Sequence, residues 1–190
     1  MSRADPVAGG GGGRYDPAVS TTTPVRIRRG GPGDVAAVLA MFDSAVAWLT
    51  AQGRTGQWGS EPFSIQPGRV RTVSGWAAGD GMRIAEVGGE PAGCMVLGAP
   101  MDYIAPAGEP ELYVQGLVID RRFAGLDVGG TLLRHAYAEA VAAGVSLLRV
   151  DCYAGDDGRL VRYYESQGFT RTEQFTVGAW PGQLLQRRVA

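Results

Sequence analysis

Two short motifs in the sequence hold residues whose types and spacing suit phosphate binding and proton transfer. In the first, Gly125, Gly129 and Gly130 lie between an apolar run that ends at Ile119 and an Ala-rich run with leucines at helical spacing. A strand that delivers such a turn into a helix N-terminus aims unpaired N–H groups and the positive end of the helix dipole at one spot. The motif therefore predicts a site for a phosphate or pyrophosphate group.

The glycines alone do not establish this site. The chain has 30 glycines in 190 residues, and a tight connection between a strand and a helix would use the same residues. Two other phosphate folds are excluded by the pattern. A P-loop needs a lysine after its last glycine, and this chain has none; a dinucleotide fold places its motif after the first strand of a βαβ series, not past the middle of the chain.

The second motif follows a predicted buried strand that begins at Leu148. The run DDGRLVRYYESQGF predicts a short helix that closes at Gly168, with Phe169 beginning the next strand. Tyr163 and Tyr164 are adjacent in this helix, and adjacent helical residues do not face the same way. We therefore expect one tyrosine to pack inward and the other to reach a cleft, although two packed core tyrosines would fit the pattern as well.

Strand, glycine turn, helix, strand and a helix that ends in Tyr-Glu-x-x-Gly-Phe together resemble the GCN5-related N-acetyltransferase (GNAT) superfamily, over roughly residues 25–190. The resemblance implies an α/β (α+β) fold with a central mixed, mostly antiparallel sheet of about seven strands, flanked by helices and splayed at the middle. It also implies acetyl-CoA as co-substrate, without a metal. A primary amine of unidentified identity would attack the thioester directly, and a backbone N–H of the central strand would polarise the carbonyl oxygen.

The resemblance assigns cofactor binding to the central strand, the glycine turn, the start of the next helix and one residue before the last helix: Leu117, Val118, Ile119, Ala124, Gly125, Leu126, Asp127, Val128, Gly129, Gly130 and Asp157. Ala124 replaces the usual basic or amide residue, and Asp127 replaces a glycine. A carboxylate about 5 Å from a phosphate costs on the order of 1 to 3 kcal/mol. That cost would fall if Asp127 capped the helix, or if Arg121 and Arg122 supplied positive charge.

Three further residues are candidates for catalysis and for acceptor binding. Tyr164 matches the family tyrosine that protonates the departing CoA thiolate, and a phenol of pKa near 10 is a competent donor to a thiolate of pKa about 8.5. Glu111, at the head of the central strand, is a candidate general base, with a water held by Glu109 or Asp102 as the alternative. Trp58 lies in a polar loop, where it either lines the acceptor pocket or plugs the edge of the core.

Composition favours one soluble domain. Residues 1–23 form a Gly- and Thr-rich tail that we expect to be disordered, and residues 24–190 form the GNAT domain. The net charge of −1 gives no basic field for nucleic acid or anionic membranes. With no signal peptide, Cys94 and Cys152 are expected to be buried, reduced thiols of a cytoplasmic protein. Two cysteines and one histidine give no zinc cluster.

Several local elements can be placed by pattern. Asp34 is a plausible N-cap for a helix that ends near Gly53, and a second helix is expected from Pro67 to Ala78. Hairpins are expected with turns at Gly88 to Glu90 and around Trp180 to Gly182. His135 is expected to pair with Glu139 on a helix surface rather than to act in catalysis.

Two alternatives to an active enzyme stay open from the residues. A non-catalytic acyl-CoA-binding or regulatory domain would keep the fold without the reaction, and Asp127 is its best support. A purely structural interaction domain is disfavoured by the retained tyrosine motif. The acceptor is undetermined among small amines, polyamines and protein N-termini. A homodimer would be typical of the family.

Overall fold

The computed structural model describes residues 24–189, so the expected N-terminal tail lies outside the described residues. Within them, a seven-stranded sheet has the order β1-β2-β3-β4-β5-β7-β6. The strands are β1 (Val25–Arg29), β2 (Met82–Val87), β3 (Glu90–Gly98), β4 (Glu111–Ile119), β5 (Leu147–Tyr153), β6 (Thr170–Val177) and β7 (Trp180–Arg188). The longer helices are α1 (Val35–Ala51), α2 (Pro67–Ala78), α3 (Val128–Ala142) and α4 (Arg159–Ser166). Single 3₁₀ turns lie at Pro32–Asp34, Phe63–Ile65 and Arg121–Phe123.

One pair of neighbouring strands in the sheet is parallel, and the other pairs are antiparallel. The parallel pair is β4 and β5, which are joined through the helix α3. Hairpins join β2 to β3 and β6 to β7. The predicted mixed, mostly antiparallel α/β sheet is thus confirmed.

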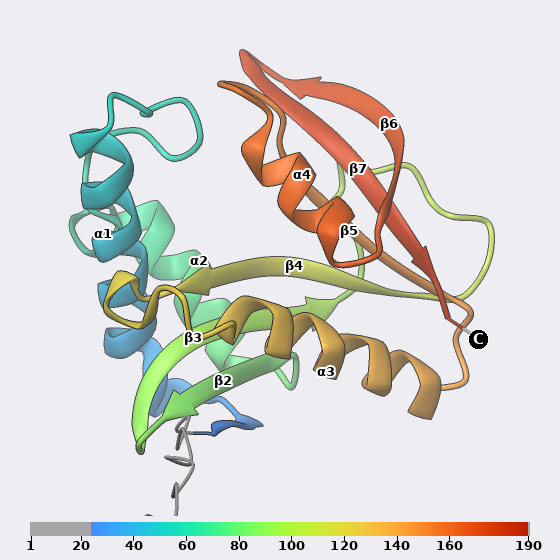
Figure 1. The fold of residues 1–190 in the computed structure, drawn as a ribbon, viewed down its shortest axis with the longest axis horizontal. Coiled ribbons are helices and arrows are strands. Elements are labelled where there is room, and N and C mark those ends of the chain that lie inside the picture. Colours follow the sequence, from blue (N-terminus) through green and yellow to red (C-terminus); the bar gives the residue numbers. More distant parts are fainter. Residues whose placement is uncertain (1–23, 190) are drawn as a thin grey trace, which may run out of the picture.

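The helices cover the two faces of the sheet and enclose separate apolar clusters (Figure 1). On one face, α3 and α4 pack through residues such as Leu132, Leu133 and Val161. On the other, α1 and α2 pack through Val38, Phe42 and Val73. In each helix the buried side chains recur at three- or four-residue spacing, which is why these sequences form helices against a sheet.

The helix α1 is apolar enough to raise the question of a membrane. The stretch Pro32–Ala51 has 20 residues and a mean hydropathy of 1.5 in its most apolar window, which by length and composition alone would allow it to cross a bilayer. Its residues Val38, Met41 and Val46 are almost completely buried between α2 and the sheet. One such helix, part of whose apolar surface packs in the core, is weak evidence for a membrane span.

Of two predicted end signals, Asp34 is confirmed as the N-cap residue of α1 by position only, and the closing turn is displaced. Asp34 precedes α1, but its carboxylate does not cap that helix. It accepts hydrogen bonds from the Gly31 backbone N–H at 2.9 Å and from Arg28 at 2.7 Å, because β1 brings that guanidinium beside it. The closing hairpin turns at Gly178 rather than at Trp180 to Gly182, since a positive φ of 59° is available at that glycine and Trp180 already belongs to β7.

Other local predictions are confirmed. Cys94 and Cys152 are both buried and free. The imidazole Nε2 of His135 lies 2.9 Å from a carboxylate oxygen of Glu139, which also accepts two hydrogen bonds from Arg83. His135 therefore contacts a polar network that joins Glu139 of α3 to the buried Arg83 of β2.

Candidate active site

The parallel strands β4 and β5 separate halfway along β4. Their pairing covers four residues on each strand and ends at Val114 with Val150. From Gln115 to Ile119, β4 remains bonded to β3, with a bulge at Gln115 between the pairs of Val96 and Leu97. The other edge of this half of β4 carries no strand among the described residues. The predicted splay is therefore present, and it leaves backbone N–H and C=O groups open to an extended ligand.

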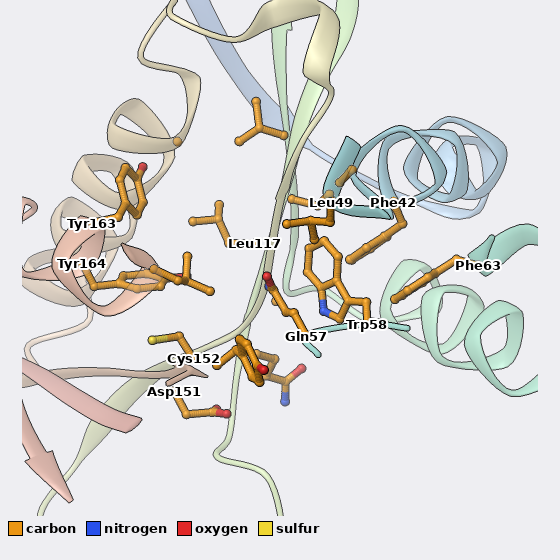
Figure 2. Close-up of a pocket in the computed structure, with 18 of the residues that line it drawn as sticks. Phe42, Leu49, Gln57, Trp58, Phe63, Leu117, Asp151, Cys152, Tyr163 and Tyr164 are labelled. Carbon is orange, nitrogen blue, oxygen red and sulfur yellow. The ribbon is translucent and has the colours of Figure 1, made fainter. Parts of the chain in front are cut away.

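A cavity of about 980 Å³ occupies the splay and continues to both faces of the sheet. Figure 2 shows Tyr163 and Tyr164 on one side of Leu117, and Trp58, Phe42 and Phe63 on the other. We call the part formed by the residues 117–129 with Tyr163 and Tyr164 the cofactor end. The part formed by Gln57, Trp58, Tyr103, Asp151, Tyr153 and Trp180 is called the acceptor end.

The cofactor end contains most of the residues predicted to bind a cofactor. Leu117, Val118, Ile119, Ala124, Gly125, Asp127, Val128 and Gly129 all line the cavity. The first helical hydrogen bond of α3 is donated by the N–H of Thr131 to the Asp127 carbonyl, so the N–H groups before Thr131 have no acceptor within the helix. At Gly129 an added Cβ would collide with the Tyr163 hydroxyl, which shows how closely α4 approaches this turn.

Asp127 does not act as the predicted side-chain cap. Its backbone adopts the left-handed region with φ of 52°, which brings the chain from the Gly125 turn into α3, and its side chain makes no capping hydrogen bond. Instead, the carboxylate accepts a hydrogen bond from Arg134, seven residues or about two turns further along α3, at 2.8 Å. Because both side chains are more than half exposed, the pair lowers the local negative charge but adds little stability.

The two arginines expected to offset Asp127 behave differently. Arg122 is bound to Asp120 at 2.9 Å and to Glu90 at 3.3 Å, so its charge is already matched. Arg121 has no acidic partner among the described residues, and its guanidinium lies 3.9 Å from the centre of the Trp48 ring on the cavity wall. Arg121 is therefore the arginine without an acidic partner that can meet a phosphate beside this turn, whereas Arg134 is paired with Asp127.

Both tyrosines of α4 line the cavity, which differs from the expectation that one would pack away. Tyr164 is 5% exposed and contacts Phe169 edge-on, whereas Tyr163 is half-buried beside Gly129. Neither hydroxyl has a hydrogen-bond partner among the described residues. Burial raises the pKa of Tyr164 well above its ordinary value, and burial together with Asp127 raises the pKa of Tyr163 to about 12. Both phenols therefore stay protonated at neutral pH.

Trp58 packs against the core and also lines the cavity, and its predicted role in acceptor binding stays a prediction. The indole packs edge-on against Phe42, with ring centres 5.2 Å apart, and against Phe63 at 5.8 Å. It also lines the cavity, where it faces the end of β4 (Figure 2). The loop after α1 is thus anchored by an aromatic cluster that doubles as a wall of the acceptor end.

Four predicted site residues lie outside the cavity. The side chain of Glu111 is held by the Arg149 guanidinium at 2.5 and 2.7 Å on the far side of the parallel pairing, so the geometry gives no support to a role as general base. Asp157 is bound by Arg54 at 3.3 Å and by the Arg159 backbone at 3.1 Å. Leu126 is exposed and Gly130 is enclosed by the Asp127 side chain, so neither reaches the cleft.

The acceptor end also contains residues that sequence reasoning missed. Asp151 comes directly after the last parallel pair of β5, and it accepts hydrogen bonds from the hydroxyls of Tyr113 at 2.5 Å and Tyr103 at 3.3 Å. The pKa of Asp151 is raised, chiefly because burial penalises its charge. The only available signal in the sequence was a lone carboxylate inside an apolar strand, which marks a buried charge that needs a reason.

The comparisons with known proteins agree with this geometry. The family model described as the acetyltransferase (GNAT) family matches residues 45–169. A GNAT-family acetyltransferase from Listeria monocytogenes is 22% identical with a TM-score of 0.68, over 86% of this chain and 94% of that one. A putative phosphinothricin N-acetyltransferase is 23% identical with a TM-score of 0.65, over 88% and 99%.

A third solved structure was determined with its cofactor. The putative acetyltransferase yncA from Salmonella typhimurium, bound to acetyl-CoA, is 18% identical with a TM-score of 0.59, over 88% of this chain and 95% of that one. A search of curated proteins gave no significant match.

The fold and the comparisons together support an acyltransferase. With the family model matched over most of its length, the chain belongs to the acetyltransferase (GNAT) family. Its residues fit the cofactor of that family in three respects. The outer edge of β4 is open beyond Val114, the α3 N-terminus lies bare at Gly129, and Arg121 and Arg134 stand near it.

Proposed function

We propose that this protein is an acetyl-CoA-dependent N-acetyltransferase that acetylates a primary amine by direct transfer. The observation that carries the proposal is the splay itself. One free strand edge and one bare helix N-terminus open into the same cavity as the Tyr164 hydroxyl. When bound, acetyl-CoA supplies an activated acetyl group as a thioester.

Different residues of the chain would bind the cofactor, polarise the acetyl carbonyl and protonate the leaving sulfur. The open N–H groups of β4 between Gln115 and Ile119 can bond the pantetheine arm and polarise the acetyl carbonyl. The N–H groups at the start of α3, with Arg121, can hold the pyrophosphate. Tyr164 can give its proton to the sulfur as the amide forms, because its phenol is buried, protonated and free of other partners.

A second candidate function is acyl-CoA binding without turnover, which the carboxylate of Asp127 favours. The ion pair between Asp127 and Arg134 weakens that argument, since it places a positive charge beside the negative one. Tyr164 lines the cavity and its hydroxyl has no hydrogen-bond partner among the described residues; a binding module would not need this group, which supports the enzyme over the binder.

A thermal-shift experiment followed by a turnover assay tests the proposal. Acetyl-CoA at 100 times its Kd should stabilise the fold by about 2.7 kcal/mol. Release of free thiol with a panel of primary amines should then distinguish the enzyme from the binder. The proposal fails if no CoA thioester shifts the melting temperature, and binding without thiol release from any amine would support the second candidate.

A further inference from the structure

The acceptor end carries a single unneutralised charge, that of Asp151. Four charged residues line the cavity, namely Arg69, Arg121, Asp127 and Asp151. Arg121 and Asp127 belong to the cofactor end, and Arg69 is exposed at the rim, where its guanidinium lies 4.6 Å from the centre of the Phe63 ring. No cationic side chain among the described residues pairs with Asp151. The neighbouring Arg149 is fully engaged by Glu111 and by the Ala105 carbonyl.

Two tyrosines hold this carboxylate in place. Tyr113, which is completely buried, and Tyr103 each donate a hydrogen bond to one of its oxygens. These bonds fix the orientation of Asp151 but do not neutralise it, and a partly buried carboxylate without a cation is costly. In Figure 2 the Asp151 side chain lies beside Cys152 at the edge of the cavity that faces Gln57. A cationic ligand in this cavity would supply the missing charge.

The surroundings of Asp151 are aromatic. Tyr103 contacts Phe175 with ring centres 5.7 Å apart, Phe175 contacts Trp180 at 6.3 Å, and Trp180 contacts Tyr153 at 5.8 Å. Trp58 closes the opposite side. Aromatic faces attract ammonium groups and pack against apolar bodies. They offer nothing to a carboxylate.

The mouth of the acceptor end is bridged by polar contacts. The loop between α1 and α2 reaches the opposite wall through Arg54 with Asp157 at 3.3 Å, and through the Trp180 indole N–H, which donates to the Gln57 carbonyl at 3.1 Å. In the same place the Tyr153 hydroxyl lies against Gly56, where no Cβ would fit. A polypeptide laid across this face would have to break these contacts, whereas a small molecule would not.

From these observations we infer that the acceptor is a small primary monoamine with an uncharged, apolar body, and that Asp151 binds its ammonium group and takes up its protons. This inference rests on the proposed function and names its substrate class. It places proton acceptance at Asp151 rather than at Glu111.

The proton balance closes without another reagent. The ammonium group gives a proton to Asp151, and the freed amine forms the N–C bond as the C–S bond breaks. The nitrogen loses its second proton by the same route to solvent. The sulfur gains a proton from Tyr164, which regains one from water. The sum is an amide, free CoA thiol and one proton released.

A matched substrate pair tests the class with the native protein. 2-Phenylethylamine and phenylalanine share one body and differ by a carboxylate, and a phenylalanyl dipeptide amide adds chain length without that charge. With acetyl-CoA as donor, kcat/KM for 2-phenylethylamine should exceed that for each of the others at least tenfold. Equal or better use of phenylalanine would overturn the inference about the uncharged body, and equal or better use of the dipeptide would overturn the inference about size.

Asp151→Asn tests the residue. The amide can still accept from Tyr103 and Tyr113 but carries no charge, so kcat/KM for the amine should fall at least 100-fold while the acetyl-CoA thermal shift stays as in the native protein. The matched control is Asp156→Asn, which alters an exposed carboxylate five residues later that does not line the cavity. Equal kinetics of the two variants would refute the role of Asp151.

These outcomes separate the two proposals. If acetyl-CoA binds and amines are acetylated without regard to Asp151, the inference fails and the proposed function stands. If acetyl-CoA gives no shift, the proposed function itself fails.

Should Asp151→Asn not fold, the substrate pair measured on the native protein still decides the class. Tyr103→Phe offers a second variant, because it removes one hydrogen bond to the Asp151 carboxylate and changes a side chain that is itself exposed. It should raise KM for the amine at least threefold. An unchanged KM in that variant would count against Asp151.

Discussion

The cofactor end of the cleft comes mainly from one continuous run of chain, residues 117–129, whereas the acceptor end is assembled from segments far apart in the sequence. In the first, β4, the turn at Gly125 and the start of α3 follow one another directly. In the second, Trp58, Asp151 and Trp180 arrive from a loop and two strands. The cofactor end is therefore set by local backbone geometry, and the acceptor end by side chains that tertiary contacts bring together.

The largest expected effect would test whether the two ends meet at Tyr164. Tyr164→Phe keeps the ring and its contact with Phe169 but removes the proton donor, so kcat should fall by roughly 10² to 10⁴ with little change in acetyl-CoA affinity. Steady-state kinetics with acetyl-CoA and the best amine would measure this. An aryl thioester of acetate, whose thiolate leaves without protonation, should narrow the gap.

Tyr163→Phe is the matched control for that prediction. It removes a neighbouring hydroxyl of similar volume, so a purely structural account expects small, equal effects at both positions. Because the pKa of Tyr164 is raised, its phenol should stay protonated. Ionisation of this group should therefore cause no fall in kcat up to about pH 9. Normal turnover by Tyr164→Phe would assign the proton to water or to another residue.

The second-largest effect is expected from a substitution at the cofactor end. Gly129→Ala forces the Tyr163 hydroxyl to move and covers the bare start of α3, so the Kd for acetyl-CoA should rise at least tenfold while the fold is retained. Calorimetric titration and thermal shift would measure both quantities. Adding Tyr163→Phe should restore part of the affinity, because it removes the colliding oxygen; a double variant no better than the single one would contradict this account.

A substitution at the acceptor end should have a smaller effect, which falls on both amine binding and stability. Trp58→Ala removes both a cavity wall and a core contact, so KM for the amine should rise about tenfold and stability should fall by about 2 kcal/mol, with KM for acetyl-CoA unaltered. Trp58→Phe should recover most of the stability and less of the KM. If stability falls and the kinetics do not change, Trp58 belongs to the core alone.

The smallest expected effect concerns Asp127. Asp127→Gly removes a negative charge near the phosphate site and relieves the left-handed φ, so acetyl-CoA should bind three- to tenfold more tightly, with stability changed by less than about 1 kcal/mol. Arg134→Gln should have the opposite effect on affinity, because it leaves Asp127 unmatched. Both effects should shrink as salt is raised. An unchanged Kd in both variants would show that this ion pair lies too far from the phosphates to matter.

The same contrast explains what could be predicted from the sequence. The order of strands and helices, the Gly125 turn and the place of Tyr164 follow from local periodicity and spacing, and most of the predicted loop residues line the cavity. Whether Asp127 capped α3 or bonded elsewhere could not be decided, because it depended on Arg134 lying about two turns further along an exposed helix face.

The residues of the acceptor end could not be predicted from local sequence, because long-range strand pairing sets their partners. Glu111 begins β4 and Asp151 lies within β5, and the local sequence does not say which of the two carboxylates acquires a cationic partner. The pairing of β4 with β5 brings Arg149 to Glu111 and leaves Asp151 to the tyrosines. A register shift of the two strands would rearrange these partners. Long-range pairing therefore determines which carboxylate keeps a free charge.

The short parallel pairing also has a mechanical consequence. Among the described residues, the strands β1 to β4 are joined to β5, β7 and β6 by four residue pairs, from Glu111 with Leu147 to Val114 with Val150. The ion pair of Glu111 with Arg149 lies across this seam on one side, and the bond of Tyr113 to Asp151 lies where it ends. The hydrogen-bonded connection between the two half-sheets is thus short, and the core cluster in which α3 packs against strands of both halves must keep them at a fixed separation.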